Sequence, residues 1–564
     1  MPRNARIEAS HVAGQLQPIA LARPGVPQWE GATWVGQIST VELDGTSFEL
    51  AGGQDFQQAR LLVWDDDQPR GSVEVPVADG LIDLAVVALE VAKLPELPPQ
   101  HLSADWPPIS IVICTRDRPE HLANVLRSLY GLDYPLFEVV VVDNNPTSGQ
   151  TPPVVGSFDG LPLRIVSAAG QGLSIARNVG VQNARFGIVA FTDDDVVIDR
   201  RWLTNIANGF SRDERVACVC GMVPTSELFT PAQAYFDQRV GWAERWRPAV
   251  YDLEDQVGED SLFPLRVSEF GTGANFAVRK SVVVALGGFD EGLGAGSPTG
   301  SGEDVDMFVR ILLGGLLLVR EPAAVVWHSH RKTLPELESQ MYGYGLGLSA
   351  WLLKLLIHPR TCWMVARRLL TGLRHLRQVT IVDHAAALEA EPGLSHVDRR
   401  EMAAVIRGPW ALLRGRLAGR RSEPLKAPRR LGRMFDFRRG QMWEEGDSSL
   451  VAGRLVVTAI VLSLIGSLGA VQSLPAGVRA VAIGIFILGG PGGLAMSFYA
   501  KMPRYALAAL TPVLGLAICI VTVTGLLMAG VYRPEMTLLA LTLASGVGGL
   551  LRCGYLVSVK RVAA

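Results

Sequence analysis

The spacing of apolar and polar positions changes twice along this chain. Residues 1–105 contain short alternating apolar runs separated by turn-rich stretches, which predicts a small β-rich module. A periodic apolar segment at 81–94 predicts a helix near the end of this module. From residue 106 to 334, short continuous apolar runs alternate with amphipathic segments. That alternation is typical of an α/β domain with a mostly parallel sheet.

Apolar runs and further strand candidates of the second region predict its strands. They lie at residues 109–114, 137–142, 163–167, 188–192 and 216–221. The segments between them predict helices at 119–130, 173–182 and 202–210. The expected fold class is therefore α/β, with a doubly wound sheet of the kind that binds nucleotides.

Residues 335–450 predict helices that lie at a membrane surface, followed by a linker. Aromatic and basic residues stand among leucines in an amphipathic pattern, at Trp351, Lys354, Trp363, Arg367 and Arg368. Between Arg407 and Arg439 the only acids are Glu423 and Asp436, which suits a segment beside anionic lipid headgroups. An ordinary solvated basic linker would have the same composition.

The last region, residues 451–564, predicts a membrane domain of four transmembrane helices. Its apolar stretches lie at 455–471, 480–499, 506–529 and 536–557, and most are long enough to cross a hydrocarbon core of about 30 Å. A glycine-rich run at 489–493 is expected to break or kink the second helix. The mean hydropathy of +0.23 is high for a soluble enzyme, and the excess comes almost entirely from this region.

Charge placement predicts the orientation of this membrane domain. Four helices return the chain to its starting side, and connecting or terminal basic residues mark that side as cytosolic, at Lys501, Arg504, Lys560 and Arg561. Residues 1–20 show no basic segment followed by an apolar run, so no cleaved leader is expected. We therefore expect a multi-pass protein of the cell membrane with its catalytic domain in the cytosol. A net charge of -2 argues against a nucleic-acid partner.

Polar motifs follow three of the predicted strands. They are Thr115-Arg116-Asp117-Arg118, Asp143-Asn144-Asn145 and Asp193-Asp194-Asp195. In open α/β sheets, ligands bind beyond the carboxyl ends of the strands, so these motifs predict a shared site. The third motif contains an Asp-x-Asp pattern, whose hard oxygen ligands suit Mg²⁺ or Mn²⁺ and leave positions open for a diphosphate.

Together with three further motifs, this arrangement resembles the family 2 glycosyltransferases over residues 108–331. The matching segments are 111–118, 141–144, 176–180, 192–195, 287–291 and 302–306. The resemblance implies a GT-A fold and an inverting, metal-dependent transfer from a nucleotide-sugar donor.

The resemblance also implies roles for single residues. Thr115, Asp117 and Asp143 would contact the nucleoside, and Arg177 and Asn178 would lie near the donor. Asp193 would lie by the ribose and beside the metal, and Asp195 would bind the metal. Three more substrate-binding residues are expected, namely Arg116, Asp194 and Glu303.

Asp304 would take the position of the general base, which removes the acceptor's proton as its oxygen attacks the anomeric carbon. The pair Glu303-Asp304 could instead be the acidic first turn of a helix. His328 follows the apolar residues 325–327. Similar enzymes often have a metal-binding histidine at such a point, so His328 is the expected metal ligand. His330 would face the same side of an extended strand, so the sequence leaves the choice between these two histidines open.

The leading hypothesis is a membrane-anchored enzyme that transfers a single sugar. Its acceptor would be membrane-associated, such as a polyprenyl-linked glycan or a cell-envelope glycolipid or polysaccharide. A processive polysaccharide synthase is a second hypothesis, although the Gln-x-x-Arg-Trp motif of such enzymes is not found after Asp304. The third is a non-catalytic, nucleotide-binding membrane scaffold or transporter.

Overall fold

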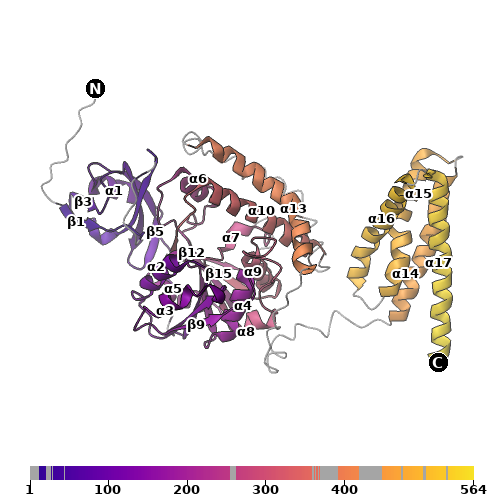
Figure 1. The fold of residues 1–564 in the computed structure, drawn as a ribbon, viewed down its shortest axis with the longest axis horizontal. Coiled ribbons are helices and arrows are strands. Elements are labelled where there is room, and N and C mark those ends of the chain that lie inside the picture. The colour runs from indigo at the N-terminus through magenta and orange to yellow at the C-terminus, as the bar shows by residue number, and fades with distance from the viewer. Residues whose placement is uncertain are drawn as a thin grey trace. The chain divides into compact units, whose positions relative to one another are not determined.

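The computed structural model in Figure 1 describes most of the chain. The described residues are 12–20, 27, 29–43, 45–103, 105–254, 262–357, 361, 364–365, 368, 391–417, 448–471, 474–499, 504–528 and 531–563. The chain forms two compact units, one of residues 1–354 and 367–435 and the other of residues 355–366 and 436–564. Each unit is considered by itself below.

The N-terminal module is β-rich, as its pattern predicts. One of its two three-stranded sheets has the order β1 (Val12–Leu16), β3 (Ser47–Leu50), β6 (Leu81–Asp83). The other has the order β2 (Thr33–Ser39), β4 (Gln58–Asp65), β5 (Gln68–Pro76). The expected helix is α1 (Leu84–Val91), which begins after residue 83 because the Asp83 carboxylate caps it by accepting a hydrogen bond from the backbone of Ala85.

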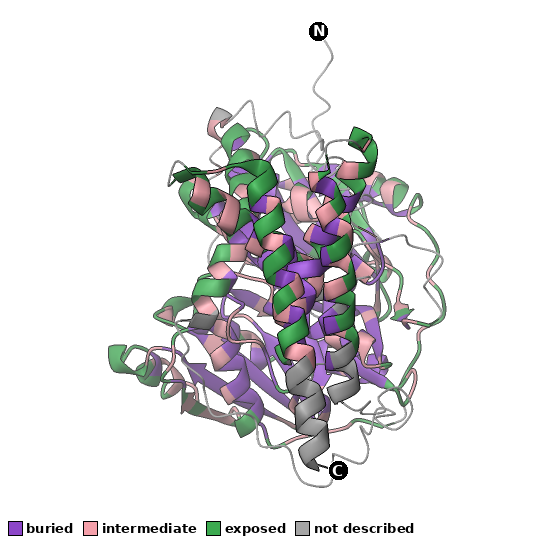
Figure 2. Cartoon of the chain, turned by 90° about the vertical axis from the view of Figure 1, so that its right-hand side faces the viewer, coloured by how far each residue is buried: buried purple, intermediate pink, exposed green. Residues whose placement is uncertain are grey.

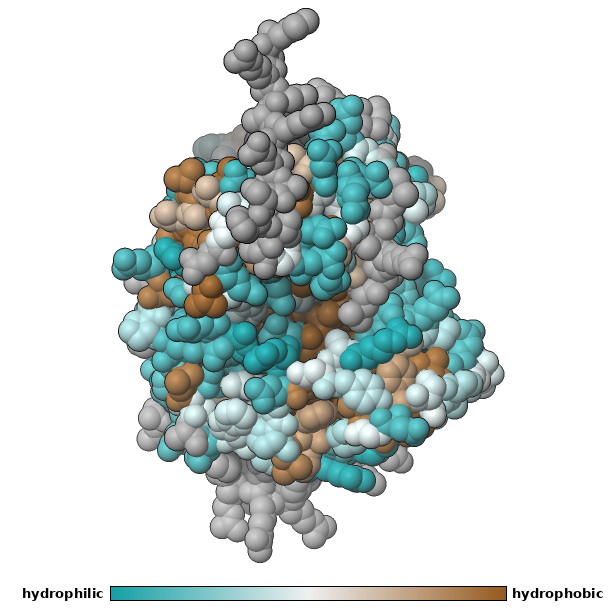
Figure 3. Space-filling model, turned by 90° about the vertical axis from the view of Figure 1, so that its left-hand side faces the viewer, coloured by the Kyte–Doolittle hydropathy of each residue, from teal (hydrophilic) through white to brown (hydrophobic). Residues whose placement is uncertain are grey.

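The module packs directly on the α/β region of the same unit. Its Val35, Leu62 and Trp64 share a buried apolar cluster with Val325 and Trp327. On the face shown in Figure 3, hydrophilic side chains cover most of the described surface and hydrophobic ones form separate groups between them. The apolar side chains of the module are therefore used largely for contact within the unit.

The α/β region contains a nine-stranded mixed sheet. Eight of its strands have the order β11-β15-β12-β14-β10-β7-β8-β9, and β13 pairs with β15. The bounds are β7 (Ile109–Thr115), β8 (Phe137–Asp143), β9 (Leu163–Ser167), β10 (Ile188–Thr192), β11 (Val196–Ile198), β12 (Val216–Met222), β13 (Ala249–Tyr251), β14 (Asn275–Arg279) and β15 (Leu317–His328). All five predicted strands are confirmed, and the four strands from β10 to β9 are parallel.

Helices cover both faces of this sheet. The helices of this part are α2 (Pro119–Leu129), α3 (Thr151–Val155), α4 (Leu173–Asn183), α5 (Trp202–Phe210), α6 (Pro231–Val240), α7 (Val267–Phe270), α8 (Lys280–Ala285) and α9 (Glu303–Leu313). Ile111 of β7 belongs to a core cluster with residues of α2 and α5. Val112 points to the other face, where Gly180 of α4 lies so close that a Cβ atom there would be 2.4 Å from the valine.

Strand register brings the polar strand ends to one edge of the sheet. Thr115 at the end of β7 lies opposite Asp143 at the end of β8. Thr192, at the end of β10, lies opposite Ile113 of β7, so the aspartates that follow Thr192 reach the same edge. The predicted convergence of the three motifs is therefore present.

Among the described residues, two long helices follow the sheet, α10 (Leu334–Ile357) and α13 (Val397–Leu417). Trp351 does not lie at a surface as the amphipathic pattern predicted, because it is buried with 1% exposure. Lys354 is held by ion pairs of 2.7 Å to Asp290 and to Asp306. Trp363, Arg367 and most of the basic segment up to Arg439 lie outside the described residues.

In the described part of the second unit there are four α-helices, α14 (Ser448–Ser467), α15 (Ala476–Met496), α16 (Arg504–Met528) and α17 (Pro534–Ala563). Among the described residues, three segments are long and apolar enough to cross a membrane, at Ala476–Met496, Leu510–Met528 and Pro534–Cys553. Many of their side chains face outward (Figure 2). The first of the four predicted spans corresponds to a shorter apolar helix, Arg454–Ala470, so the number of spans stays a prediction.

The glycine-rich run of the second predicted span does not break its helix. Helix α15 continues through Pro491, and the glycines around this proline are buried. A Cβ atom at Gly492 would lie 1.9 Å from the backbone oxygen of Thr511 in α16. The small residues therefore permit close contact between two helix backbones.

Candidate active site

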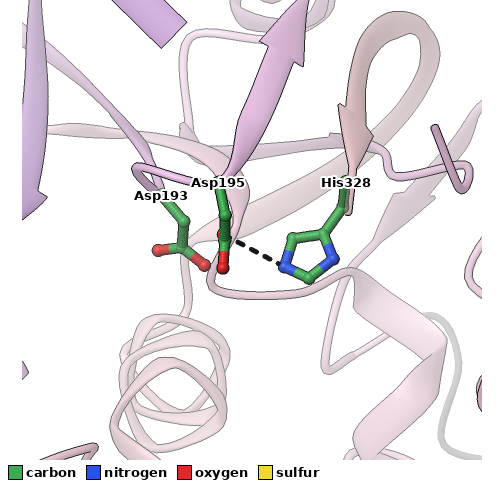
Figure 4. A group of neighbouring side chains, drawn as sticks. All are labelled: Asp193, Asp195 and His328. Carbon is green, nitrogen blue, oxygen red and sulfur yellow. Dashed lines mark ion pairs between the residues drawn. The ribbon is translucent and has the colours of Figure 1, made fainter. Parts of the chain in front are cut away.

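Two carboxylates and one imidazole meet at the carboxyl edge of the sheet (Figure 4). Asp193 and Asp195 follow β10, and His328 is the last residue of β15. One ligand atom from each of the three residues lies within 4.8 Å of the others. His328 Nε2 is 3.3 Å from Asp195 Oδ1. Oxygen and imidazole donors in this number fit Mg²⁺ or Mn²⁺.

Cationic side chains surround Asp195. Arg118 Nη1 lies 2.9 Å from Asp195 Oδ2, and Arg331 Nη1 lies 3.5 Å from the same oxygen. Burial alone would raise the pKa of Asp195, but its contact with His328 and the charges of the two arginines lower this pKa overall. Asp195 is therefore held as a carboxylate, the form that binds a cation.

Asp194 faces the end of β7. Its Oδ2 accepts a hydrogen bond of 2.7 Å from the Thr115 hydroxyl, and its Oδ1 accepts one of 2.7 Å from Arg118. Burial and the neighbouring charge of Asp195 raise the pKa of Asp194 to about 6, although Arg118 opposes them. Asp194 therefore connects the turn at residues 193–195 to the first strand-end motif.

Arg177 of α4 connects the aspartate turn with the start of α9. Its guanidinium is buried and lies 2.7 Å from Glu303 Oε1 and 3.7 Å from Asp193 Oδ1. It also donates a hydrogen bond of 2.9 Å to the backbone oxygen of Gly273. Three aromatic rings lie 5.4–5.9 Å from the guanidinium carbon, those of Phe191, Phe276 and Phe289.

Asp304 lies beside this arginine, at the start of α9. A Cβ atom on Gly273 would be 2.8 Å from Arg177 Nη2 and 3.1 Å from Asp304 Oδ2, so both side chains lie against this glycine. Burial and the adjacent Asp304 charge raise the pKa of Glu303 to about 7, with Arg177 acting in the opposite direction. The predicted helix start is present, and it places both acids next to the Asp193 turn.

The remaining strand-end residues lie at the ends of β7 and β8. Asp143 is buried, and its Oδ1 accepts a hydrogen bond of 2.9 Å from the backbone of Asn145. Asp117 is more exposed, and the Asn145 amide donates to both of its carboxylate oxygens. The hydrogen bond from the Asn145 side chain, followed by one from Ser148, lowers the pKa of Asp117. Arg116 donates a 2.7 Å hydrogen bond to the backbone oxygen of Asn144.

Comparison with known proteins identifies the part of the chain that carries the strand-end aspartates. Residues 110–282 match the model of the family described as glycosyl transferase family 2. The chain carries a family 2 glycosyltransferase domain. Its sheet, with the carboxylates at its carboxyl edge, is that of the expected GT-A fold.

Curated relatives share the domain but not the whole chain. The pre-mycofactocin glycosyltransferase of Mycobacterium tuberculosis is 27% identical over 237 residues, which are 42% of this chain and 46% of that protein. The succinoglycan biosynthesis protein ExoM of Rhizobium meliloti is 29% identical over 226 residues, covering 39% of this chain and 65% of that protein. The chain thus spans about half the length of the first of these relatives.

A search of solved structures finds a mannosyltransferase, PcManGT, from Pyrobaculum calidifontis, solved with GDP-Man and Mn²⁺. It is 19% identical and has a TM-score of 0.37, and the match covers 57% of this chain and 91% of that chain.

Within the glycosyltransferase domain, Asn178 has a different position from the other expected site residues. Its amide donates a 3.0 Å hydrogen bond to the backbone oxygen of Phe289, and its oxygen accepts one of 2.8 Å from the Phe289 nitrogen. These two bonds hold the backbone at Phe289, whose ring lies against Arg177. Asn178 thus contacts the backbone that positions Phe289, and Phe289 in turn packs against Arg177.

Three polar residues of the glycosyltransferase domain are missing from the set predicted by sequence. Arg118 and Arg331 both contact Asp195; Arg118 belongs to the first strand-end motif, and Arg331 follows His330. Asn144 accepts a 2.9 Å hydrogen bond from Gly172 at the start of α4. For Arg118 and Asn144 the signal was their place in strand-end motifs, but sequence alone could not show which of these side chains turn inward.

Proposed function

We propose that this protein is a membrane-anchored, metal-dependent inverting glycosyltransferase. It would move a single sugar from a nucleotide-sugar donor to a membrane-associated acceptor, such as a polyprenyl-linked glycan or a cell-envelope glycolipid or polysaccharide. The reaction would take place on the cytosolic side. The observation that carries the proposal is the position of Asp304 beside a cluster of Asp193, Asp195 and His328, joined to it through Arg177.

The strand-end residues would hold the donor. Thr115, Arg116, Asp117 and Asp143 line the ends of β7 and β8, where a nucleoside can lie against the edge of the sheet. Asp193, Asp195 and His328 would hold Mg²⁺ or Mn²⁺. When bound, this ion would neutralise the charge that develops on the departing diphosphate.

The acids at the start of α9 would act on the acceptor. Asp304 would take the proton of the acceptor hydroxyl as its oxygen attacks the anomeric carbon, and a single displacement inverts the configuration at that carbon. Arg177 would keep Asp304 and Asp193 in a fixed relation through its contacts with Gly273, Glu303 and Asp193. Glu303 and Asp194 would support substrate binding through their contacts with Arg177 and Thr115.

The apolar helices of the second unit support the membrane part of the proposal. A multi-pass anchor in the cell membrane would keep the enzyme next to a lipid-linked acceptor, and the basic loop residues favour a cytosolic catalytic domain.

The test is release of free nucleotide from a panel of nucleotide sugars by the full-length protein in membranes, with Mn²⁺ or Mg²⁺. Excess EDTA should abolish the release, and so should Asp195→Asn, which keeps the size of the side chain but weakens the metal site. Asp159→Ala, a change at an exposed aspartate of the same domain, serves as the matched control. Nucleotide binding without turnover of any sugar would instead favour the non-catalytic scaffold.

A further inference from the structure

Helix α13 has one face that is fixed to the first unit. Tyr235 of α6 donates a 2.9 Å hydrogen bond to Asp398, and Arg239 of α6 forms a 2.9 Å ion pair with Glu401. Ala404 and Leu412 are buried on the same side of α13. Both acids of this helix are therefore directed toward the protein.

The opposite face of α13 carries an exposed apolar stripe. It consists of Met402, Ile406, Trp410 and Leu413, which are 47%, 76%, 74% and 47% exposed within the described part of the chain. These residues are spaced by four, four and three positions, so they line one side of an α-helix. Isolated exposed apolar residues are ordinary, but four in a row on one helix face indicate a contact surface.

Basic residues border this stripe. Arg399, Arg400, Arg407 and Arg414 are all exposed. Arg400 and Arg407 contact α10 at Glu338 and at the Tyr342 hydroxyl, which keeps both side chains next to the stripe. Arg400 is paired with Glu338, and the acids of α13 face the protein, so Arg399, Arg407 and Arg414 give the border of the apolar stripe its positive charge.

We propose that this face of α13 lies on an anionic lipid surface. Apolar side chains with a tryptophan among them enter the boundary between headgroups and acyl chains, and arginines beside them pair with lipid phosphates. The contact would hold the catalytic domain near a membrane-bound acceptor. It rests on the membrane attachment proposed above, but not on the proposed reaction.

The test uses the full-length protein in liposomes of phosphatidylcholine and phosphatidylglycerol that contain nitroxide-labelled lipid. An environment-sensitive fluorescent amino acid replaces Ile406 or, as a control, Leu89, which is 66% exposed on α1. Fluorescence should be quenched at position 406 and retained at position 89. Arg407→Gln with Arg414→Gln should reduce the quenching.

Equal quenching at the two positions in protein that floats with the liposomes would overturn the lipid contact and favour a protein partner for this face. Protein that does not float would overturn both this contact and the membrane attachment. Because the readout is spectroscopic, loss of transferase activity alone would leave its result unchanged.

A separate observation concerns the polar residues behind His328. Its Nδ1 lies 3.2 Å from His330 Nδ1, and His330 Nε2 lies 3.5 Å from Asp237 Oδ1 on α6. Asp237 is also paired with Arg60 of the N-terminal module. The His330 ring is fixed by Phe236 and Trp242, whose ring centroids lie 4.8 Å and 6.0 Å away.

A cation bound at His328 Nε2 would require the proton of that ring to lie on Nδ1, from which it can be donated to His330 Nδ1, 3.2 Å away. The proton of His330 would then lie on Nε2, the atom that faces Asp237 Oδ1 at 3.5 Å.

We infer that His330 is a positioning residue for the metal ligand His328, with Asp237 and Arg60 behind it. Partners of this kind orient a ligand histidine and typically change metal affinity by about 10–100-fold. The sequence left open which histidine binds metal, and this arrangement assigns different tasks to the two. It also gives the N-terminal module a task at the active site.

The test is binding of Mn²⁺ alone to the full-length protein, followed by electron paramagnetic resonance. His330→Phe keeps an aromatic ring between Phe236 and Trp242 but removes the acceptor, so Mn²⁺ affinity should fall about 10–100-fold. His330→Gln supplies an amide oxygen as acceptor and should retain most of the affinity. Parent-like affinity in His330→Phe, or equal weakening by both changes, would overturn the inference.

Discussion

Arg177 is the side chain whose replacement should reveal most about how the site is held together. It is buried with 2% exposure, and its charge faces Glu303 at 2.7 Å and Asp193 at 3.7 Å. Arg177→Met retains a long apolar stem among the three phenylalanine rings but leaves two carboxylates without their cation. Removing one partner of a buried ion pair typically costs about 3–5 kcal/mol.

The cost should depend on pH, because Glu303 can take up a proton. Its pKa is already raised to about 7 and rises further when Arg177 is lost. At pH 6 the protonated Glu303 needs no cation, whereas at pH 8 ionisation of a buried carboxylate opposes folding. The destabilisation by Arg177→Met should therefore be larger at pH 8 than at pH 6.

Thermal unfolding of the full-length protein in detergent with EDTA, at both pH values, measures this difference. Adding Glu303→Gln to Arg177→Met should recover much of the lost stability at pH 8, since it removes the carboxylate that lost its partner. The reasoning would be refuted by equal destabilisation at pH 6 and pH 8, or by a double variant no more stable than Arg177→Met.

Three further predictions concern the base, pH and topology. Asp304→Asn should lower transfer by about 10²–10⁴-fold while donor binding, measured by calorimetry, is retained; a larger loss in Glu303→Gln would move the base away from Asp304. In EDTA, the folded parent protein binds the Glu303 proton more tightly than the unfolded chain does. As the pH rises from about 4.5 to about 7, the unfolded chain loses this proton first, so the free energy of unfolding should fall by up to about 3 kcal/mol. Glu303→Gln, followed by thermal unfolding, should lack this part of the pH dependence. Protease outside sealed cells should spare tags at both ends of the chain, and loss of only one tag would contradict four spans.

The sheet and its polar edge could be predicted because they depend on local patterns. In Phe137–Asp143 four consecutive valines precede Asp143, so strand and strand end are read from the same seven positions. The charge partners could not be predicted, because Arg177 and Glu303 are 126 positions apart and meet only when α4 and α9 pack. Likewise, alternation placed His328 and His330 on one side of a strand, but only packing shows that His328 faces Asp195 and His330 faces Asp237.

The amphipathic pattern after residue 335 illustrates the same limit of local reasoning. Trp351 has the sequence environment of an interfacial residue, yet α10 is covered by other parts of the unit and this side chain is buried. Trp410, with a similar environment, lies on α13 and is exposed. Which of two similar helices remains open is decided by their neighbours.

Strand β15 links the N-terminal module to the proposed metal site in a way that matters for dissecting the protein. Val325 and Trp327 stand just before His328, and Val35, Leu62 and Trp64 of the module cover them. A chain shortened to begin at residue 106 would expose these two apolar side chains on the strand that carries the histidine. Such a shortened protein should aggregate or bind metal poorly even though every residue of the catalytic edge is still present.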